Sequence, residues 1–396
     1  MPSELLSFPL RSPFMRNQLR SSIGLGLICL TVPLHAFQGV SDDSLRGVLV
    51  DHALPLKGPG GALLLKEARN HDFFLLGELH GETEIPALLR EFWPDLWKDG
   101  YRHVAAEVSP WAADYLEQSS RRNMAPIVGL WNRDQARSIY RFATASQHVL
   151  WGCDIEEGQP ERVILAMAKL NPGHAKLRQM TEIIGHGYDR VQAPTLLSLA
   201  EIDPPAHDAP IGGFSLWRSL IDTLRVEALR SNPATRLAAS DAREAVMKEL
   251  LVAHYQHQSP GKVLLRFGRN HLHRGYDERG VSTLGNFVGE WALASKKTVF
   301  NVGVFAAGGK EHLAGQTFDA DESHDDLAFA SLAKLSGSNP TVFDLRTLRP
   351  RFHSIPSGKR TPLEARLVYW ADSYDFLICY PVVSPLKDDP GQPLLN

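Results

Sequence analysis

Two stretches of this chain end alike: residues 73–81 read Phe-Phe-Leu-Leu-Gly-Glu-Leu-His-Gly, and residues 263–271 read Val-Leu-Leu-Arg-Phe-Gly-Arg-Asn-His. Each is an apolar run of strand length that closes with Gly-x-x-His. Such runs are typical of buried strands in parallel sheets. In open α/β sheets, ligands bind just beyond the carboxyl ends of the strands. We therefore expect His80 and His271 to lie together at one edge of a sheet.

Strand-like and helix-like segments alternate around these two motifs. An apolar helical face runs between Thr83 and Gly100, at the spacing of an amphipathic helix. Further strands are predicted over residues 102–108, 148–152 and 297–304, and near 341–345 and 374–380. Strands alternating with helices indicate βαβ units. The predicted fold is α/β, with a largely parallel central sheet flanked by helices.

One long segment breaks this alternation. Residues 158–258 carry several helical patterns and few strand signals. We interpret them as a helical insertion that lies over the rim formed by the carboxyl ends of the strands. Residues 308–326 and 350–362 are predicted to be loops, and the tail 387–396 is predicted to be disordered.

Composition indicates a globular protein and gives no sign of nucleic-acid binding. The 396 residues are 43% hydrophobic and 22% charged, with a net charge of −3 and no basic stripe. A basic segment from Met15 precedes an apolar stretch over residues 23–34, which is too short to span a membrane. Residues 1–36 are therefore predicted to be a signal peptide, with Met1 or Met15 as the start. Residues 37–396 would form a single exported domain, periplasmic or secreted, without a transmembrane segment, and its oligomeric state stays open.

Cysteine usage does not require a disulfide. Cys153 and Cys379 both lie in apolar strand-like runs, where a cysteine behaves as a small hydrophobic residue. An oxidising compartment would allow them to pair. The unpaired state is our preferred prediction.

The first motif combines a carboxylate and an imidazole. Glu78 and His80 are two residues apart, so they share a face if the chain is extended. A carboxylate beside a histidine can bind a metal or raise the basicity of the imidazole. The alternative is a capped loop in which both side chains bond to the backbone.

Other strands place ionisable residues at the same predicted rim. Glu107 follows an apolar run, and its structural alternative is a salt bridge with an arginine such as Arg90 or Arg102. Asp154 follows the third strand, where an N-cap is the alternative. Arg269, inside the second motif, is a candidate for clamping a carboxylate or phosphate group. Glu156, His186, His254 and His257 are expected to have structural roles.

Several common enzyme signatures do not occur in the sequence. The chain has no Gly-x-Ser-x-Gly elbow, no P-loop and no Gly-x-Gly-x-x-Gly after a strand. An ordinary serine hydrolase and a nucleotide-binding fold of these types are therefore disfavoured.

The ordered motifs resemble a known superfamily. A strand ending in Gly-Glu-x-His-Gly, a second ending in Glu and a late strand ending in Gly-x-x-His are similar to erythromycin esterase-like hydrolases, ChaN-like haem-binding proteins and Tiki-type metalloproteases. The resemblance covers most of residues 70–305. It implies catalytic roles for Glu78, His80, Glu107 and His271.

The same resemblance implies further roles. It makes Arg90 a candidate for substrate binding, beside Asp154 and Arg269, which are candidates from their positions in the sequence alone. It also makes His80, Glu107 and His271 candidate metal ligands. The chain lacks the lipid-anchoring cysteine and the Asp-rich continuation of ChaN-like proteins, which argues against haem. The cofactor stays open between none, a divalent metal and, with less support, haem.

Three functions are compatible with these observations. The first is an exported hydrolase that activates water with a Glu/His site on an ester- or amide-type bond of a small molecule or peptide. The second is a haem- or metal-binding protein. The third is a relative without catalytic activity, whose rim is structural.

Overall fold

The computed structural model describes residues 42–122, 133–143, 148–157, 159–185, 187–208, 210–211, 214–258, 261–313 and 316–386. These described residues form one compact unit around an eight-stranded sheet in the order β1-β11-β12-β8-β2-β7-β3-β4. The predicted signal segment 1–36, His186 and the tail 387–396 lie outside the described residues. No described helix is both long and apolar enough to cross a membrane.

The sheet is largely parallel, as predicted. Its strands are β1 (Ala53–Pro55), β2 (Phe73–Glu78), β3 (Tyr101–Ala106), β4 (Leu150–Gly152), β7 (Lys262–Gly268), β8 (Val299–Ala306), β11 (Thr341–Asp344) and β12 (Phe376–Tyr380). All neighbours from β12 to β4 pair in parallel. Only β1 and β11, at one edge, join by antiparallel pairing.

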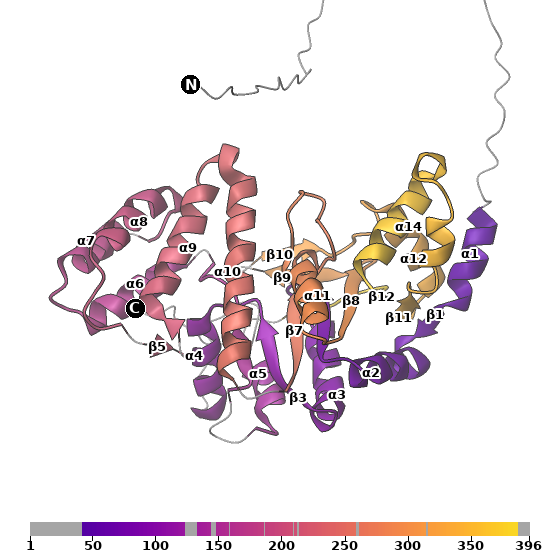
Figure 1. Ribbon diagram of the computed structural model, residues 1–396, viewed down its shortest axis with the longest axis horizontal. Helices are drawn as coiled ribbons and strands as arrows, with labels where there is room; N and C mark the ends of the chain where they lie inside the picture. The colour runs from indigo at the N-terminus through magenta and orange to yellow at the C-terminus, as the bar shows by residue number, and fades with distance from the viewer. Residues whose placement is uncertain are drawn as a thin grey trace, which may run out of the picture. The chain divides into compact units, whose positions relative to one another are not determined.

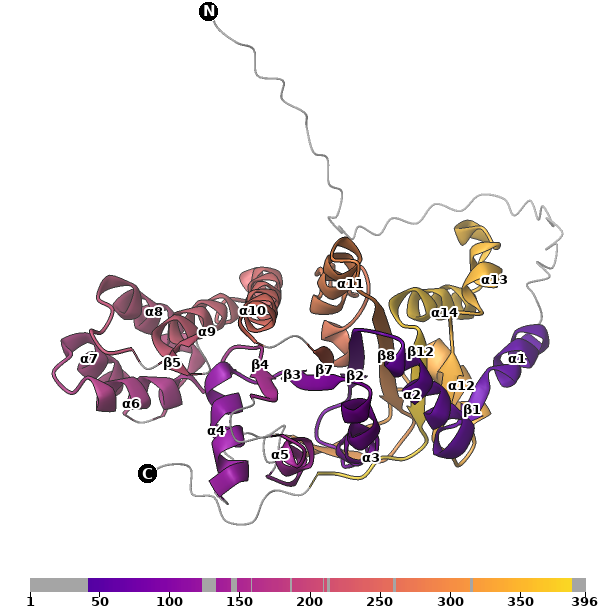
Figure 2. The same ribbon diagram turned by 60° about the horizontal axis from the view of Figure 1, so that its bottom comes forward.

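Helices cover both faces of this sheet. Before the insertion they are α1 (Asp42–Asp51), α2 (Gly61–Arg69), α3 (Glu84–Lys98), α4 (Pro110–Arg122) and α5 (Arg133–Tyr140). After it they are α11 (Leu284–Ala294), α12 (Leu327–Ser336), α13 (Arg349–His353) and α14 (Pro362–Ser373). Figure 2 shows α3 and α5 on one side of the sheet, and α11 and α14 on the other.

Strand β2 explains why the central strands are apolar throughout. Phe74 and Leu76 point into the core formed with α2 and α3, whereas Phe73 and Leu75 point into the core formed with α10, α11, α12 and α14. Side chains alternate between the faces of a strand, and both faces here are buried. A continuous apolar run is the consequence.

The helical insertion has a core of its own. It comprises α6 (Pro160–Leu170), α7 (Ala175–Ile183), α8 (Ala193–Ile202), α9 (Leu216–Arg230) and α10 (Arg236–His257), with two very short strands, β5 (Pro210–Ile211) and β6 (Phe214–Ser215). Val163, Met180, Leu196 and Trp217 are buried together within it. Figure 1 shows these helices gathered on the β3 side of the sheet, away from β1, and Figure 2 shows β4 next to them. Helix α10 also joins the core of the main sheet through Met247.

Two predicted loops contain regular structure. Residues 308–326 include a hairpin of β9 (Lys310–Leu313) and β10 (Gln316–Asp319), and residues 350–362 include most of α13 and the start of α14. The hairpin has no buried face and hence no apolar alternation to reveal it. It is joined to the first motif, because the His312 amide donates to the Gly81 carbonyl at 2.7 Å.

Cys153, Cys379 and His254 are buried. Cys153 and Cys379 are both free, which confirms the preferred prediction. His254 lies at the end of α10, where it stacks on Trp151 with ring centroids 5.3 Å apart. Burial lowers the pKa of His254 to about 4, so it is neutral and acts as a packing residue.

Candidate active site

The register of the sheet brings the two histidine motifs together. Strands β2 and β7 are parallel neighbours, with Glu78 opposite Gly268. His80 and His271 follow these positions, so both leave the same edge of the sheet. Glu107 follows the next strand, β3, and completes the group.

Glu107 lies between the two imidazoles. Its Oε2 is 3.5 Å from His80 Nε2, and its Oε1 is 3.4 Å from His271 Nε2. The same carboxylate accepts hydrogen bonds from the Gly268 amide at 2.6 Å and from Arg243 Nη2 at 2.8 Å. Burial alone would raise the pKa of Glu107, but the charges of the two histidines hold it well below its usual range. Glu107 is therefore ionised.

His271 is fixed from a second side. Its Nδ1 lies 2.5 Å from Glu244 Oε1, on α10, and Glu244 Oε2 accepts from the Leu284 amide. Burial opposes the charged imidazole, yet Glu107 and Glu244 raise the pKa of His271 to about 9. The His271 side chain is thus a buried cation at neutral pH, held between two carboxylates.

His80 is the more accessible histidine. Its side chain is 27% exposed, and its Nδ1 lies 3.7 Å from Glu78 Oε1. Glu78 also forms a buried ion pair with Arg266 at 2.5 Å. Burial lowers the pKa of His80, but the effects of Glu107 and Glu78 outweigh it and raise the pKa well above its ordinary value. The neutral imidazole therefore becomes abundant only at alkaline pH.

Gly268 is required for this arrangement. A Cβ at this position would lie 2.6 Å from His80 Nε2 and 3.1 Å from Glu107 Oε2. Any side chain here would push the imidazole away from the carboxylate. The glycine before the second Gly-x-x-His histidine thus makes room for the histidine of the first motif.

Arg243 gathers three carboxylates at the rim. Its Nη2 lies 2.8 Å from Glu107, 2.5 Å from Asp154 and 2.5 Å from Glu157. Burial raises the pKa of Asp154 to about 6, and Arg243 offsets this only in part. The predicted site residue Asp154 is therefore at the rim, where its main contact is a guanidinium.

The acidic trio does not fit a metal site in this arrangement. Among the described residues, one group of candidate ligands has donor atoms within 4.8 Å of one another, and it comprises Glu107, Asp154 and Glu157. Arg243 already pairs with all three of these carboxylates. Neither histidine belongs to the group, so the metal set His80, Glu107 and His271 stays a prediction without a matching geometry.

A cavity of about 530 Å³ opens in front of these side chains, and His80, Glu107, His271, Asp154 and Arg243 all line it. Its size is ordinary for a small-molecule site.

Glu156 also lines this cavity and accepts a hydrogen bond from Ser109 Oγ. Burial raises the pKa of Glu156 to about 7, and this effect outweighs those of Ser109 and Arg162, which lower the pKa. A proton carrier that titrates near neutrality therefore faces the same space as His80.

Two predicted substrate-binding residues do not line this cavity. Arg90 is exposed on α3. Arg269 pairs with Glu322 at 2.6 Å and lines a different cavity. The alternative partners suggested for Glu107, Arg90 and Arg102, are also wrong, because its cation is Arg243.

Sequence reasoning missed Arg243, Glu244 and Arg266. The first two lie inside a long mixed helix, in which no motif distinguishes them. Arg266 had a detectable signal, because it interrupts the apolar run of β7. A charged residue inside a buried strand needs a buried partner, here Glu78.

Comparisons with known proteins support the fold. No protein-family model and no curated relative matches the chain. A protein of Bacillus cereus superposes with a TM-score of 0.56 and 14% identity, over 88% of this chain and 100% of that one. A succinoglycan biosynthesis protein gives 0.56 and 14%, over 88% and 98%.

The third comparison bears on the resemblance inferred from the motifs. A histidine-to-asparagine mutant of the erythromycin esterase EreC, in its open conformation, superposes with a TM-score of 0.55 and 11% identity, over 83% of this chain and 94% of that one. The chain therefore has the fold of the erythromycin esterase-like proteins, as its motifs predicted.

Proposed function

We propose that this protein is a hydrolase that activates water for attack on an ester- or amide-type bond of a small molecule or peptide. One observation carries the proposal. His80 is held between the carboxylates of Glu78 and Glu107, and it is exposed to a cavity of about 530 Å³. An imidazole oriented by a carboxylate beside a cavity is the arrangement that general base catalysis needs.

The other side chains have complementary roles in this mechanism. Neutral His80 takes a proton from water, whose oxygen attacks the carbonyl carbon. His271, as an imidazolium, and Arg243 stabilise the negative charge that develops on the carbonyl oxygen. The bond to the leaving group then breaks, and the departing oxygen or nitrogen receives a proton from Glu156. Ionised Glu107 fixes both histidines.

The raised pKa of His80 makes the mechanism pH-dependent. For aryl esters, whose leaving groups depart without a proton from Glu156, kcat/KM should rise with pH on the alkaline side of neutrality, because the base form of His80 is scarce at neutral pH. A rate that is already maximal near pH 6.5, the ordinary value for histidine, would contradict this role for His80.

A substrate panel tests the proposal. It should contain aryl esters, alkyl esters, anilides, short peptides and erythromycin, since one structural neighbour is an erythromycin esterase. His80→Ala should abolish turnover of whichever compound is cleaved, by roughly 10²-fold or more, with little change in Tm. Strong unfolding of His80→Ala would support the alternative of a structural rim. Activity of His80→Ala equal to wild type would refute the mechanism.

Glu156 can be tested separately through the leaving group. Glu156→Gln cannot supply a proton, so it should slow alkyl esters more than aryl esters, whose leaving groups depart without protonation. Gln159→Ala, at another position that lines the cavity, is the matched control. Equal slowing of both ester types would exclude Glu156 as the proton donor.

The haem- or metal-binding alternative has less support. It requires His80 and His271 to offer Nε2 to a ligand, and both of these atoms face the Glu107 carboxylate, at 3.5 and 3.4 Å. Metal analysis and haem titration of the purified protein test this alternative, and stoichiometric binding that His80→Ala abolishes would place it first.

Export through residues 1–36 remains a proposal, and fractionation of expressing cells tests it.

A further inference from the structure

A second cavity, of about 580 Å³, adjoins the turn that carries His271. Arg269 and Asn270 line this second cavity, whereas His271 lines the candidate active site, and the two sets of lining residues do not overlap. The remaining walls come from residues 277–279, from residues 322–329 and from α14. Its volume also lies in the range of small-molecule sites.

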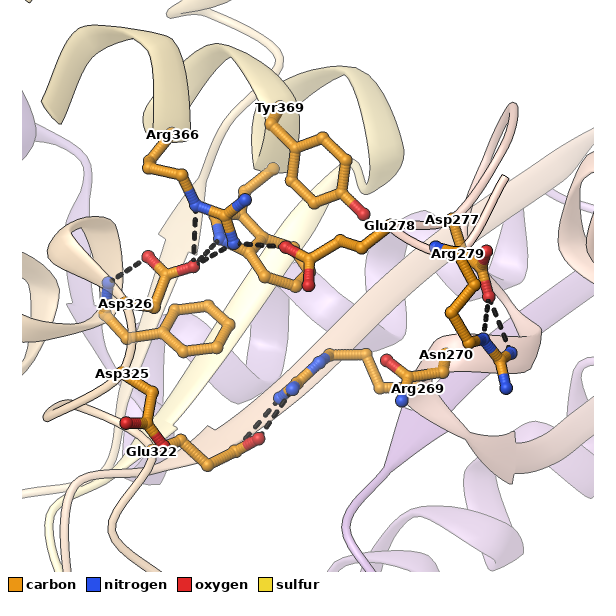
Figure 3. Close-up of a pocket in the computed structure, with 12 residues that line it drawn as sticks. Arg269, Asn270, Asp277, Glu278, Arg279, Glu322, Asp325, Asp326, Arg366 and Tyr369 are labelled. Carbon is orange, nitrogen blue, oxygen red and sulfur yellow. Dashed lines mark hydrogen bonds and ion pairs between the residues drawn. The ribbon is translucent and has the colours of Figure 1, made fainter. Parts of the chain in front are cut away.

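Each arginine of the second cavity is paired with a carboxylate. Figure 3 shows three separate pairs around the space: Arg269 with Glu322, Arg366 with Asp326, and Arg279 with Asp277. Arg269 meets both oxygens of Glu322, at 2.6 and 3.0 Å. Glu278 makes an additional contact with Arg366, at 2.6 Å. The Arg269–Glu322 pair is bidentate, whereas Arg366 and Arg279 each direct two nitrogens at a single carboxylate oxygen.

Aromatic rings hold two of the guanidinium groups in place. Arg269 lies over Phe329 and Trp370, at 4.8 and 5.2 Å from the ring centroids. Arg366 lies over Tyr369 and Trp370, at 4.7 and 5.4 Å. The lining is therefore ordered before any ligand arrives. Arg269 Nε is also buried without an acceptor among the described residues, so one donor of this side chain is unused.

We propose that the second cavity binds a neutral polyhydroxylated molecule, of the saccharide class. An anionic group would have to displace a carboxylate from its arginine. A cationic group could reach Asp325 without breaking a pair, but Asp325 is exposed, so that ion pair would add little. The lining also carries two more carboxylates than guanidiniums, which disfavours an anion. A hydroxyl group both donates and accepts hydrogen bonds. It can therefore bond to the carboxylate lone pairs and guanidinium N–H groups that the ion pairs leave unused, while every ion pair stays intact.

The ligand could be part of the hydrolysed substrate or a separate molecule. Both sources have the same chemistry, and kinetics separates them. A glycoside that fills a substrate subsite should compete with a glycosylated substrate and raise its KM. A glycoside that acts as a separate effector should not compete with the substrate, and it should change kcat. The binding itself does not depend on the proposed hydrolysis, so His80→Ala should bind the glycoside as wild type does.

Three probes on one pyranose ring test the proposal: methyl glucoside, glucuronate and glucosamine. Saturation-transfer NMR and calorimetry on the full protein should show millimolar binding of the neutral probe, with glucuronate weaker and glucosamine no tighter. Tyr369→Phe removes one lining hydroxyl, and Arg279→Gln replaces the guanidinium that pairs with Asp277 by a shorter, neutral amide. Both should weaken binding of methyl glucoside by about fivefold.

Matched variants outside the second cavity control for general effects. Arg225 is exposed to a similar degree as Arg279 and is likewise paired with acidic residues, and Tyr255 is a half-buried tyrosine on α10. Arg225→Gln and Tyr255→Phe should bind methyl glucoside as wild type does. Tighter binding of glucuronate or glucosamine would overturn the proposal, as would the absence of binding by any neutral glycoside in a wider panel.

Discussion

The close contact at Gly268 allows a quantitative prediction. Gly268 has φ −50° and ψ 135°, a conformation that alanine adopts without strain. In Gly268→Ala the new Cβ would lie 2.6 Å from His80 Nε2, whereas a relaxed contact is about 3.5 Å. The imidazole must therefore retreat by about 1 Å. A displacement of that size at a reacting group lowers the rate by about 10²-fold.

One kinetic and one spectroscopic measurement test the prediction for Gly268→Ala. In Gly268→Ala, kcat/KM should fall by about a hundredfold, because His80 loses its position beside Glu107. The pKa of His80, measured by NMR titration, should fall toward 6.5 as the Glu107 charge recedes. Gly173→Ala is the control, because a Cβ there meets nothing within 4 Å. A Gly268→Ala protein with wild-type kcat/KM and an unchanged His80 pKa would refute the reasoning.

Three further predictions concern the buried charges. Arg243→Met leaves buried carboxylates without their cation and should lower the free energy of unfolding by about 3–5 kcal/mol in urea titrations, whereas Arg225→Met, at an exposed pair, should change it by less than about 1 kcal/mol. The pKa of His271 is raised to about 9 from 6.5, so its stabilising contribution is complete below pH 6.5 and is lost as the pH rises to about 9. The difference in free energy of unfolding between wild type and His271→Asn should shrink by roughly 3 kcal/mol over that window, and a constant difference would contradict it. Burial, with the charge of Glu78, raises the pKa of Glu82 to about 8 from 4.5, so the neutral carboxyl is the form that the fold favours. The Tm of Glu82→Gln should therefore rise relative to that of wild type as the pH rises from 4.5 to about 8. If the Tm of Glu82→Gln falls relative to wild type over this range, Glu82 is needed in its ionised form.

The sequence predicted the fold because its strongest signals are local. The runs that became β2 and β7 are apolar because both faces of the sheet are covered, and their terminal Gly-x-x-His motifs showed which end of each strand carries polar groups. Parallel pairing then required His80 and His271 to share an edge. The hairpin β9–β10 had no such signal, because neither of its faces is buried.

The partners of the site residues could not be predicted in the same way. Arg243 and Glu244 reach the rim from α10, which belongs to neither motif, and their positions depend on how the insertion packs. Nothing in the local pattern of a mixed helix indicates which arginine will be buried. Arg266 differs, since its place inside an apolar strand is itself a sign of a buried ion pair.

This division between local and distant signals has a chemical consequence. The motifs determine where the imidazoles lie, but their protonation is governed by groups from other elements: Glu107 on the β3 edge and Glu244 on α10. Without these carboxylates, burial would make both histidines neutral and weakly basic. With them, His271 is a cation suited to an oxyanion, and His80 becomes a base only as the pH rises. The position of the insertion helix α10 is therefore part of the catalytic chemistry that we propose, because a shift of α10 would change the charge of His271 and the balance of charge around Glu107.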